Sequence, residues 1–418
     1  MRYRTISVIG LGYIGLPTAA AFASQNIKVI GVDKNQKVVN TINQGAIHIT
    51  EPDLDAVVRS AVSAGYLKAV TTPEPADAFL IAVPTPFITK NHQADLSYIE
   101  AASKSVAPVL KAGDLVVLES TSPVGTTEKM VAWMASLRPD LSFPLTDKKD
   151  ADIKVAYCPE RVLPGQVMRE LVENDRVIGG LTHQCSQASI ALYKIFVKGN
   201  CIATTVRTAE MAKLTENSFR DVNIAFANEL SLICDELDID VWELIQLANR
   251  HPRVNILQPG VGVGGHCIAV DPWFIINKTP ARAKLIHAAR LVNDGKPQWI
   301  LEKIQRRLEA FLQANPSKKI QEISIACYGI AFKADIDDLR ESPALEIVKH
   351  LASWHTGFVL VVEPNITALP RELKTKAQLV KLETALAEAE IHVLLVDHQQ
   401  FYKIKTPKGC TLDFKGIW

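Results

Sequence analysis

Residues 6–15 read I-S-V-I-G-L-G-Y-I-G, a short apolar run followed by glycines in the spacing G-x-G-x-x-G. The apolar run predicts a buried strand, and the residues after it have the pattern of a helix. In this context Gly10 permits a tight turn, Gly12 lets a pyrophosphate approach the backbone, and Gly15 lets the helix pack closely. The stretch therefore predicts the first strand, turn and helix of a dinucleotide-binding unit.

A carboxylate follows the next predicted strand. Asp33 comes directly after the apolar run 28–32, eighteen residues after Gly15. A carboxylate at this position can accept hydrogen bonds from both ribose hydroxyls, and it repels a 2′-phosphate. The expected cofactor is therefore NAD rather than NADP.

Similar apolar runs alternate with helical patterns through the first half of the chain. Because the runs are continuous rather than alternating, they predict parallel strands that are covered on both faces. The expected strands are residues 6–9, 28–32, 78–83, 115–118 and 155–157. The pattern is typical of a doubly wound α/β domain.

The pattern changes after residue 206. Residues 207–236 and 241–249 predict helices with no strand between them, and the polar stretch 315–319 predicts a linker. Strands are expected again at residues 323–328, 358–362 and 391–396. The expected fold class is α/β, with two doubly wound, Rossmann-like parallel sheets joined by a helical segment with a long central helix. The expected domains are residues 1–200, 201–314 and 315–418.

Composition limits the classes of partner. Lys and Arg number 46 against 45 Asp and Glu, for a net charge of +1, so no basic face for nucleic acid or an acidic membrane is expected. The seven cysteines are odd in number and form no C-x-x-C pair, which argues against a disulfide framework or a structural zinc site. No metal is expected, and a reducing cytoplasm fits best.

A second glycine-rich stretch has a different context. Gly260, Gly262 and Gly265 lie in P-G-V-G-V-G-G-H-C, and the preceding residues 251–259 do not form a strand pattern. A loop that approaches a ligand and presents Cys267 is the better interpretation. Taken alone, however, Cys267 is better interpreted as an inert, small apolar residue, as most free cysteines are.

Five segments occur together in a characteristic order. They are E-S-T-S-P-V-G-T-T (119–127), Y-C-P-E-R-V-L-P-G (157–165), A-E-M-A-K-L-T-E-N-S-F-R (209–220), G-V-G-G-H-C-I-A-V-D-P (262–272) and F-K-A-D-I-D-D-L-R-E-S-P (332–343). In this order the chain resembles the UDP-glucose/GDP-mannose dehydrogenase family over nearly its whole length. The likeness is to the branch that acts on UDP-linked N-acetylated sugars: H-C-I-A-V-D replaces the S-C-F-P-K-D usual in UDP-glucose dehydrogenases, and Asn223 replaces a common lysine. Ala269 and Val261 replace prolines frequent among relatives.

The resemblance implies a four-electron oxidation of UDP-N-acetyl-D-mannosamine that uses two NAD per sugar, with UDP-GlcNAc or UDP-GalNAc as alternative substrates. Cys267 is then the nucleophile that holds the aldehyde as a thiohemiacetal and then a thioester, and Lys213 is the acid–base residue. A nearby cation such as Lys213 also helps to form the thiolate.

Lys213, Asn217 and Arg220 fall on one face of the predicted central helix. The resemblance implies that Lys213 and Asn217 stabilise the oxyanion, although a solvated helix face is the alternative. Asp271 is implied in proton transfer with Lys213. Glu160 and Thr121 are implied in activating and holding the hydrolytic water. A buried structural salt bridge is the alternative for both Asp271 and Glu160.

The resemblance also implies the binding residues. The cofactor-binding residues are Gly10, Gly12, Tyr13, Ile14, Gly15, Asp33, Thr85, Thr126 and Arg340. The substrate-binding residues are Arg161, Val162, Lys213, Asn217, Arg220, His251, Arg253, Gly264 and Lys333. The cations suit an anionic pyrophosphate, and a surface ion pair is the alternative for each single arginine.

The resemblance further implies a homodimer or higher homo-oligomer, with His251 and Arg253 reaching the partner's site, and a product for a bacterial surface polysaccharide such as an enterobacterial common antigen. Two other classes stay open. One is a nucleotide-sugar sensor on a retired dehydrogenase fold, and the other is a β-hydroxyacid dehydrogenase, which stops after one hydride. The yield of NADH per sugar separates the three.

Overall fold

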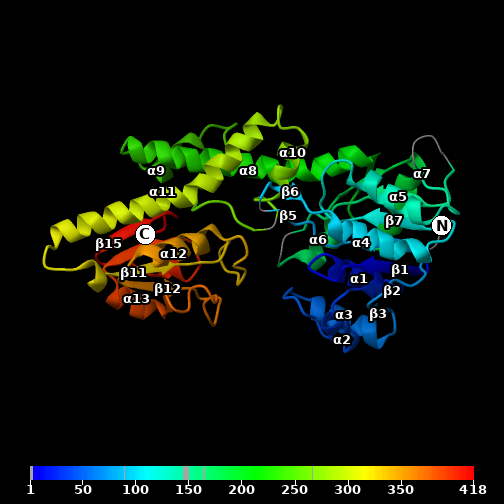
Figure 1. The fold of residues 1–418 in the computed structure, drawn as a ribbon, viewed down its shortest axis with the longest axis horizontal. Coiled ribbons are helices and arrows are strands. Elements are labelled where there is room, and N and C mark those ends of the chain that lie inside the picture. The colour runs from blue at the N-terminus through cyan, green and yellow to red at the C-terminus, as the bar shows by residue number, and fades with distance from the viewer. Residues whose placement is uncertain (1–2, 89, 145–149, 163–164, 266) are drawn as a thin grey trace. The chain divides into compact units, whose positions relative to one another are not determined.

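The computed structural model describes residues 3–88, 90–144, 150–162, 165–265 and 267–418. Within them the chain divides into two compact units. The first runs to Glu216 and includes Trp273–Lys278, and the second contains Asn217–Pro272 and Thr279–Trp418. Each unit is built around a mainly parallel sheet, as the sequence predicts (Figure 1).

Among the described residues, the first unit contains an eight-stranded sheet in the order β3-β2-β1-β4-β7-β8-β9-β10. Its strands are β1 (Thr5–Ile9), β2 (Lys28–Val32), β3 (Leu67–Val70), β4 (Ala78–Ile81), β7 (Leu115–Leu118), β8 (Lys154–Tyr157), β9 (Arg176–Gly180) and β10 (Cys201–Thr205). The first six follow the strand order of a dinucleotide-binding fold, so the loop after β1 lies where the strand order reverses. The predicted strands of this sheet pair in parallel, and β9, which was not predicted, pairs with β8 in antiparallel register.

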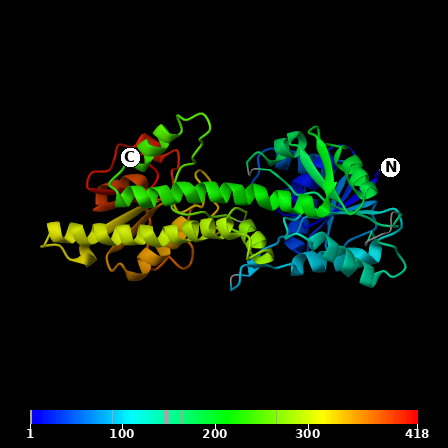
Figure 2. The same cartoon turned by 90° about the horizontal axis from the view of Figure 1, so that it is seen from above.

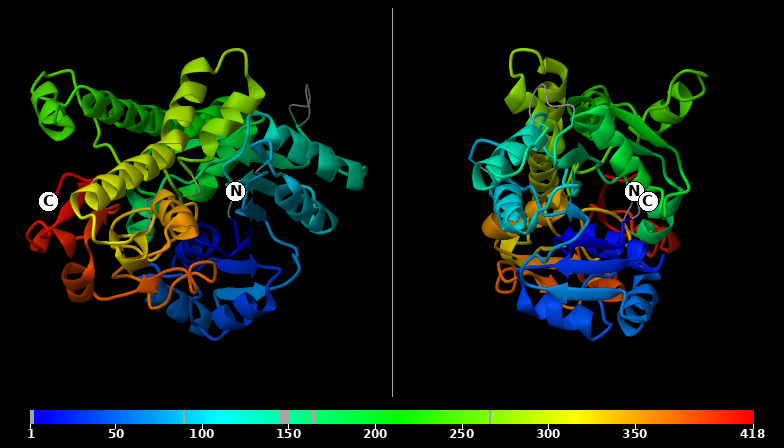
Figure 3. Two further views of the ribbon diagram at one scale, coloured as in Figure 1. Left: turned by 60° about the vertical axis from the view of Figure 1, so that its left-hand side comes forward. Right: turned by 90° about the vertical axis from the view of Figure 1, so that its right-hand side faces the viewer.

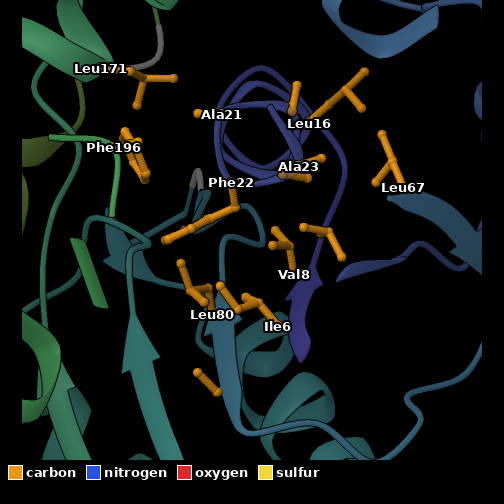
Figure 4. Packing of buried hydrophobic residues seen from close by; sticks show 14 of the residues in the cluster. Ile6, Val8, Leu16, Ala21, Phe22, Ala23, Leu67, Leu80, Leu171 and Phe196 are labelled. Atoms are coloured by element: carbon orange, nitrogen blue, oxygen red, sulfur yellow. The ribbon is translucent and has the colours of Figure 1, made fainter. Parts of the chain in front are cut away.

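Helices cover both faces of this sheet, and alternate residues of each strand pack against them. Ile6, Val8 and Leu80 belong to a core with α1, and Figure 4 shows Phe22 of α1 directed toward this core, where its ring meets Phe196 edge to face at 4.7 Å. The helices of this face are α1 (Gly15–Ala23), α2 (Gln36–Asn43), α3 (Leu54–Ser63), α6 (Val167–Glu173) and α7 (His183–Tyr193). The helices α2 and α3 appear in blue beside β2 and β3 in Figure 3.

The opposite face of the first sheet has a separate core. Its helices are α4 (Ser97–Val106), α5 (Thr126–Leu137) and the start of α8 (Val206–Glu236). Ile9, Phe79 and Ile81 point to this side. In the chain, a short hairpin of β5 (Phe87–Ile88) and β6 (Gln93–Ala94) precedes α4, and a 3-10 turn (Ala107–Val109) follows α4.

Within its described residues, the second unit contains a five-stranded parallel sheet in the order β13-β12-β11-β14-β15. The strands are β11 (Ser324–Tyr328), β12 (Phe358–Val362), β13 (Gln378–Leu379), β14 (Ile391–Leu394) and β15 (Cys410–Asp413). Strand β11 pairs with both β12 and β14, so its carboxyl end marks the reversal of strand order in this sheet. In both sheets a ligand is expected outside the carboxyl ends of the strands, at the point where the strand order reverses.

The second unit is rich in helices. They are α9 (Val241–Ala248), α10 (Asp271–Lys278, which the unit boundary divides), α11 (Lys284–Ala314), α12 (Pro343–Trp354) and α13 (Leu382–Glu388), with 3-10 turns at Ile320–Glu322 and Phe401–Lys403. Figure 2 shows the green α8 and the yellow α11 side by side, and buried polar contacts such as Asn228 to Asn293 join them. Helices α11 and α12 pack on one face of the sheet, and α13 packs on the other.

The predicted elements are confirmed with small shifts at their ends. The central helix begins at Val206 rather than 207, and the strands expected at 78–83 and 391–396 end earlier, at Ile81 and Leu394. The polar stretch 315–319 does follow a helix end, at Ala314. The strands β3, β9, β10, β13 and β15 were not predicted. No helix among the described residues is both long and apolar enough to cross a bilayer.

Candidate active site

The first glycine loop has the geometry that its sequence predicts. Gly10 has φ +91°, and an added Cβ would lie 2.7 Å from the Ala82 carbonyl oxygen. An added Cβ on Gly15 would lie 1.7 Å from the Gly10 oxygen, whereas one on Gly12 would meet no described protein atom within 4 Å. The loop therefore needs glycine for its own packing at two positions and leaves open space over the third, where a pyrophosphate would lie.

Asp33 lies beside this loop at the end of β2. Its Oδ2 accepts a hydrogen bond from the Leu11 N–H at 3.1 Å, and its Oδ1 accepts one from Asn35 at 2.9 Å. The carboxylate is only half-buried, so lone pairs remain for a ribose. The same carboxylate thus shapes the glycine loop and borders the space over it.

Hydroxyl groups near the ends of β4 and β7 also suit a cofactor. The Thr85 Oγ1 is shielded from solvent and has no hydrogen-bond partner among the described residues. Thr126 begins α5, and its hydroxyl donates to the Pro123 carbonyl at 2.6 Å, which leaves its lone pairs as acceptors. Tyr13 is exposed and Ile14 is half-buried on the glycine loop. These residues fit a dinucleotide at the carboxyl ends of the strands.

Sequence reasoning missed the residue that holds the start of α5. Glu210 of α8 is buried, and its carboxylate accepts hydrogen bonds from the Gly125 N–H at 2.6 Å and the Thr127 N–H at 2.9 Å. Burial raises the pKa of Glu210, although these hydrogen bonds oppose that rise. Glu210 belongs to the segment 209–220, but nothing in the sequence indicates that its carboxylate contacts the segment 119–127.

Cys267 differs from the other cysteines in its exposure. All seven are described, and Cys267 is exposed while the others are buried or partly buried. Burial raises the pKa of the Cys158 and Cys327 thiols to about 12. It also raises the pKa of Cys201 and Cys410. Accessibility and acidity both disfavour those thiols as nucleophiles.

The second glycine loop packs against a distant motif of the second unit. An added Cβ on Gly264 would lie 2.4 Å from the Glu341 carbonyl oxygen, and one on Gly265 would lie 3.0 Å from the Phe332 ring. Gly262 and Gly265 have φ +133° and +82°, a region that favours glycine. The loop that carries Cys267 therefore touches the segment that carries Lys333.

Asp271 links the cysteine turn to the central helix. Its backbone N–H donates to the Cys267 carbonyl at 2.8 Å, and its carboxylate accepts a hydrogen bond from the Asn217 amide. Asn217 and Asp271 are both buried. Since an amide carries two N–H groups, the second remains to bind a reacting oxygen. Lys213 is half-buried one turn earlier on α8, and the half-buried Thr121 belongs to the loop between β7 and α5.

Glu160 lies in a buried ionic cluster rather than alone. Its carboxylate is 2.8 Å from the Arg176 guanidinium, and both side chains are nearly inaccessible. The guanidinium lies over the Tyr193 ring, and the Tyr193 hydroxyl donates to Glu119 at 2.6 Å. Sequence reasoning named Glu160 and the alternative of a salt bridge, but missed Arg176, Tyr193 and Glu119 because their separation in the chain gives no local signal.

The candidate basic residues for substrate binding, together with the cofactor candidate Arg340, fall into two groups. Arg161 pairs with Glu216 at 2.7 Å, and Arg340 pairs with Asp338 at 2.6 Å. Arg220, His251, Arg253 and Lys333 are exposed. Val162 packs at the edge of the first core, and Gly264 lies in the second glycine loop.

Comparison with known proteins gives three matching domain models of one family, the UDP-glucose/GDP-mannose dehydrogenases. The NAD binding domain matches residues 4–197, the central domain 207–295 and the UDP binding domain 326–417. Together these ranges cover most of the chain, and the UDP binding domain contains the second sheet except for the first two residues of β11.

Individual relatives span the full length. The UDP-N-acetyl-D-mannosamine dehydrogenase of Yersinia pestis is 63% identical over 421 residues, with 100% of both chains covered. The NDP-N-acetyl-D-galactosaminuronic acid dehydrogenase of Ralstonia nicotianae is 62% identical over 419 residues, with 100% of this chain and 96% of the relative covered. The solved UDP-D-ManNAc dehydrogenase of Pyrococcus horikoshii has a TM-score of 0.87 at 38% identity, covering 99% of this chain and 96% of that one. The chain therefore belongs to the UDP-glucose/GDP-mannose dehydrogenase family and is an NAD-dependent oxidoreductase.

Proposed function

We propose that this protein oxidises the C6 alcohol of UDP-N-acetyl-D-mannosamine to the carboxylate and gives UDP-N-acetyl-D-mannosaminuronate with two NAD reduced per sugar. The full-length identity to the Yersinia pestis enzyme supports the substrate. The observation that carries the chemistry is an exposed cysteine on a turn bound to the buried Asp271–Asn217 pair. A single oxidation to an aldehyde needs no such thiol.

The proposed chemistry runs through Cys267. NAD supplies the hydride acceptor in each of the two oxidations. The Cys267 thiolate attacks the aldehyde carbon and forms a C–S bond, and the oxygen takes a proton to give a thiohemiacetal. The thiohemiacetal then loses its hydroxyl proton and a second hydride, which NAD accepts, and becomes a thioester. Water attacks the thioester carbonyl, the C–S bond breaks, the Cys267 thiolate leaves and the acid is released. The covalent bond keeps the aldehyde from escaping.

Lys213, Asn217 and Asp271 are the proposed proton-transfer and oxyanion groups. Lys213 accepts the proton of the C6 alcohol, and Asn217 donates its second N–H to the oxyanion. Asp271 orients Asn217 and works with Lys213. Thr121 holds the hydrolytic water, and Glu160 polarises it from its ion pair with Arg176.

The remaining binding roles follow charge and position. The proposed cofactor residues are Gly10, Gly12, Tyr13, Ile14, Gly15, Asp33, Thr85, Thr126 and Arg340. The proposed UDP-sugar residues are Arg161, Val162, Lys213, Asn217, Arg220, His251, Arg253, Gly264 and Lys333. The exposed basic residues Arg220, His251, Arg253 and Lys333 suit a pyrophosphate, because none of them forms an ion pair with another described residue. Arg161 and Arg340 each form an ion pair with an acidic side chain, so a bound phosphate would share their charge with that side chain.

We further infer a homodimer that forms through the central helix. Three large apolar side chains are exposed on one face of α8, seven residues apart: Phe219 at 69%, Phe226 at 53% and Ile233 at 44%. Leu237, directly after the end of the helix and four residues after Ile233, is 61% exposed. A stripe with this spacing suits packing against a second copy of the same helix. Light scattering should give twice the chain mass, and Phe226→Lys should reduce it to one chain.

A specific observation favours a second candidate sugar. The Ralstonia nicotianae relative, whose name refers to an N-acetyl-galactosaminuronic acid, is almost as similar as the Yersinia pestis enzyme. A panel of UDP-ManNAc, UDP-GlcNAc, UDP-GalNAc and UDP-glucose, followed by NADH absorbance, tests the proposal. We expect the highest kcat/KM with UDP-ManNAc, and a higher value with UDP-GalNAc would transfer the assignment to that sugar.

The proposal also covers the cellular context of the reaction and the role of each domain. The product is an aminouronic acid donor for a bacterial surface polysaccharide, made in the cytoplasm where thiols stay reduced. Residues 1–200 bind NAD, residues 201–314 dimerise and contribute to catalysis, and residues 315–418 bind the UDP-sugar.

A further inference from the structure

The loop that carries Lys333 has no regular secondary structure. It follows β11 and begins at Gly329, whose φ is +85° and whose added Cβ would lie 2.4 Å from Val396. Asp335, two residues after Lys333, also has a positive φ of +61°. Such a loop keeps one conformation only where surrounding groups satisfy its backbone.

Glu363 satisfies the first part of this loop. It follows β12, is 4% exposed, and its Oε2 accepts hydrogen bonds from the Ile330 N–H at 2.8 Å and the Ala331 N–H at 3.1 Å. Although burial opposes it, hydrogen bonds from His398 and from the Ile330 N–H lower the pKa of Glu363. The group is therefore an ionised carboxylate enclosed by donors.

His398 satisfies the end of the same loop. Its side chain is fully buried, and its Nδ1 accepts a hydrogen bond from the Asp335 N–H at 2.9 Å. Because a backbone N–H can only donate, neutral His398 must carry its proton on Nε2, which lies 3.0 Å from the Glu363 Oε2. The Asn365 amide at 3.2 Å and the Phe401 ring complete its surroundings, and the Asp335 carboxylate lies 3.7 Å away.

The two side chains thus form one buried unit that holds the loop on both sides of Lys333. Asp33 of the first sheet gives a useful comparison, because it also accepts a hydrogen bond from the loop after the first strand. Asp33 is half-buried and can still reach a ligand, whereas the Glu363 oxygens are occupied by protein donors. Glu363 therefore suits the positioning of a loop and not direct contact with a ribose.

We propose that Glu363 and His398 are a positioning pair that fixes residues 330–335 in the conformation in which Lys333 binds the diphosphate of the UDP moiety. This inference rests on the proposed substrate role of Lys333. A loop that is already ordered binds its ligand without an ordering cost, so loss of the pair should weaken UDP binding while the chemistry, once the site is saturated, proceeds as before.

The test measures binding of UDP alone to the full-length protein by calorimetry. His398→Ala removes both contacts and should weaken UDP binding about tenfold. His398→Asn keeps an acceptor for the Asp335 N–H, and His398→Gln keeps a donor for Glu363, so each should recover part of the affinity. KM for the UDP-sugar should rise in parallel, with kcat and the KM for NAD within about twofold of wild type.

His355→Asn is the matched control. His355 is a buried histidine of the same unit that bonds the Ile323 carbonyl at 3.0 Å, before β11 and away from the Lys333 loop. It should leave UDP affinity unchanged at a similar loss of thermal stability. Equal weakening in His355→Asn, or unchanged affinity in folded His398→Ala and His398→Asn, would overturn the positioning role.

Lys333→Ala tests the proposed substrate role of Lys333 separately from the role of the positioning pair. If Lys333→Ala weakens UDP binding and the His398 variants do not, the positioning pair alone is wrong. If Lys333→Ala binds UDP as tightly as wild type, the substrate role of Lys333 is wrong and this inference falls with it.

Discussion

The Asn217 side-chain amide donates a hydrogen bond to the Asp271 carboxylate, whose own backbone N–H donates to the Cys267 carbonyl. Two residues far apart in the chain thereby fix the position of the turn that presents the thiol. Both side chains are buried, so the contact is shielded from solvent. The geometry explains why an asparagine lies at this position of α8, but it leaves two roles for Asp271, one in proton transfer and one in support of Asn217.

Asp271→Asn distinguishes the two roles, because the variant keeps an oxygen that can accept the Asn217 hydrogen bond but removes the charge. If the carboxylate takes part in proton transfer, kcat should fall by about 100- to 10,000-fold with NAD affinity and thermal stability little changed. Steady-state kinetics and NAD titration check this. Asp294→Asn, at a half-exposed carboxylate of α11, is the control and should keep kcat. A fully active Asp271→Asn would leave Asp271 a purely structural partner.

Cys267→Ala should abolish formation of the acid, since none of the other six described thiols is exposed. In the wild-type protein, iodoacetamide should modify Cys267 ahead of the other six cysteines, measured by mass spectrometry of peptides. Cys201→Ala, at a partly buried thiol, should keep both turnover and the labelling of Cys267. Acid production by Cys267→Ala at the wild-type rate would show that the thiol is not the nucleophile.

Asp33→Asn tests the choice of cofactor without removal of the acceptor that holds the Leu11 N–H. The variant has no charge to repel a 2′-phosphate and accepts more weakly from a ribose. We expect the ratio of kcat/KM for NAD over NADP to fall by about tenfold or more, because hydrogen bonds to charged groups contribute about 1.5–3 kcal/mol. The ratio is measured for both proteins at one pH. Comparable use of NADP and NAD by the wild-type protein contradicts the ribose assignment.

Glu119 gives a prediction about pH and stability. Burial raises its pKa from the ordinary 4.5 to about 7, against the opposing effect of Arg176. The folded state disfavours the charged form of Glu119. The contribution of protonated Glu119 to the free energy of unfolding is therefore fully present below pH 4.5 and is lost as the pH rises through about 7. This contribution is on the order of 3 kcal/mol at most. Glu119→Gln keeps an acceptor for the Tyr193 hydroxyl but does not titrate.

The melting temperature of Glu119→Gln relative to wild type should therefore rise between pH 5 and pH 8. The difference between the two proteins is the useful quantity, since titrating groups that do not interact with Glu119 contribute equally to both. A difference that stays constant over this range would contradict the raised pKa. It would show that Glu119 is charged throughout, or that other contacts offset the cost of burying its charge.

Local patterns in the sequence were enough for the first glycine loop, Asp33 and the buried central strands. Each depends on residues that are close in the chain, where apolar runs and glycine spacing act directly on the backbone. Strands β9 and β10 were missed for the converse reason: β10 reads C-I-A-T-T and is largely exposed, and β9 begins with Arg176 and ends in two glycines. Their pairing is set by neighbouring strands.

The same distinction applies to the site. The spacing of Lys213 and Asn217 follows from helix geometry, and the resemblance supplied Cys267 and Asp271. Arg176, Glu210, Glu363 and His398 act on residues that are distant in sequence, and each is an ordinary charged or polar residue until the fold brings its partner into contact. A single sequence contains no signal for such pairs.

The central claim is a four-electron oxidation, and the yield of NADH from a limiting amount of UDP-N-acetyl-D-mannosamine tests it most directly. With NAD in excess and the reaction run to completion, absorbance should show two NADH for each sugar consumed, together with one equivalent of the uronic acid. One NADH per sugar, with an aldehyde as the product, would contradict the covalent route through Cys267. No NADH from any UDP-linked N-acetylhexosamine would contradict the proposed activity altogether.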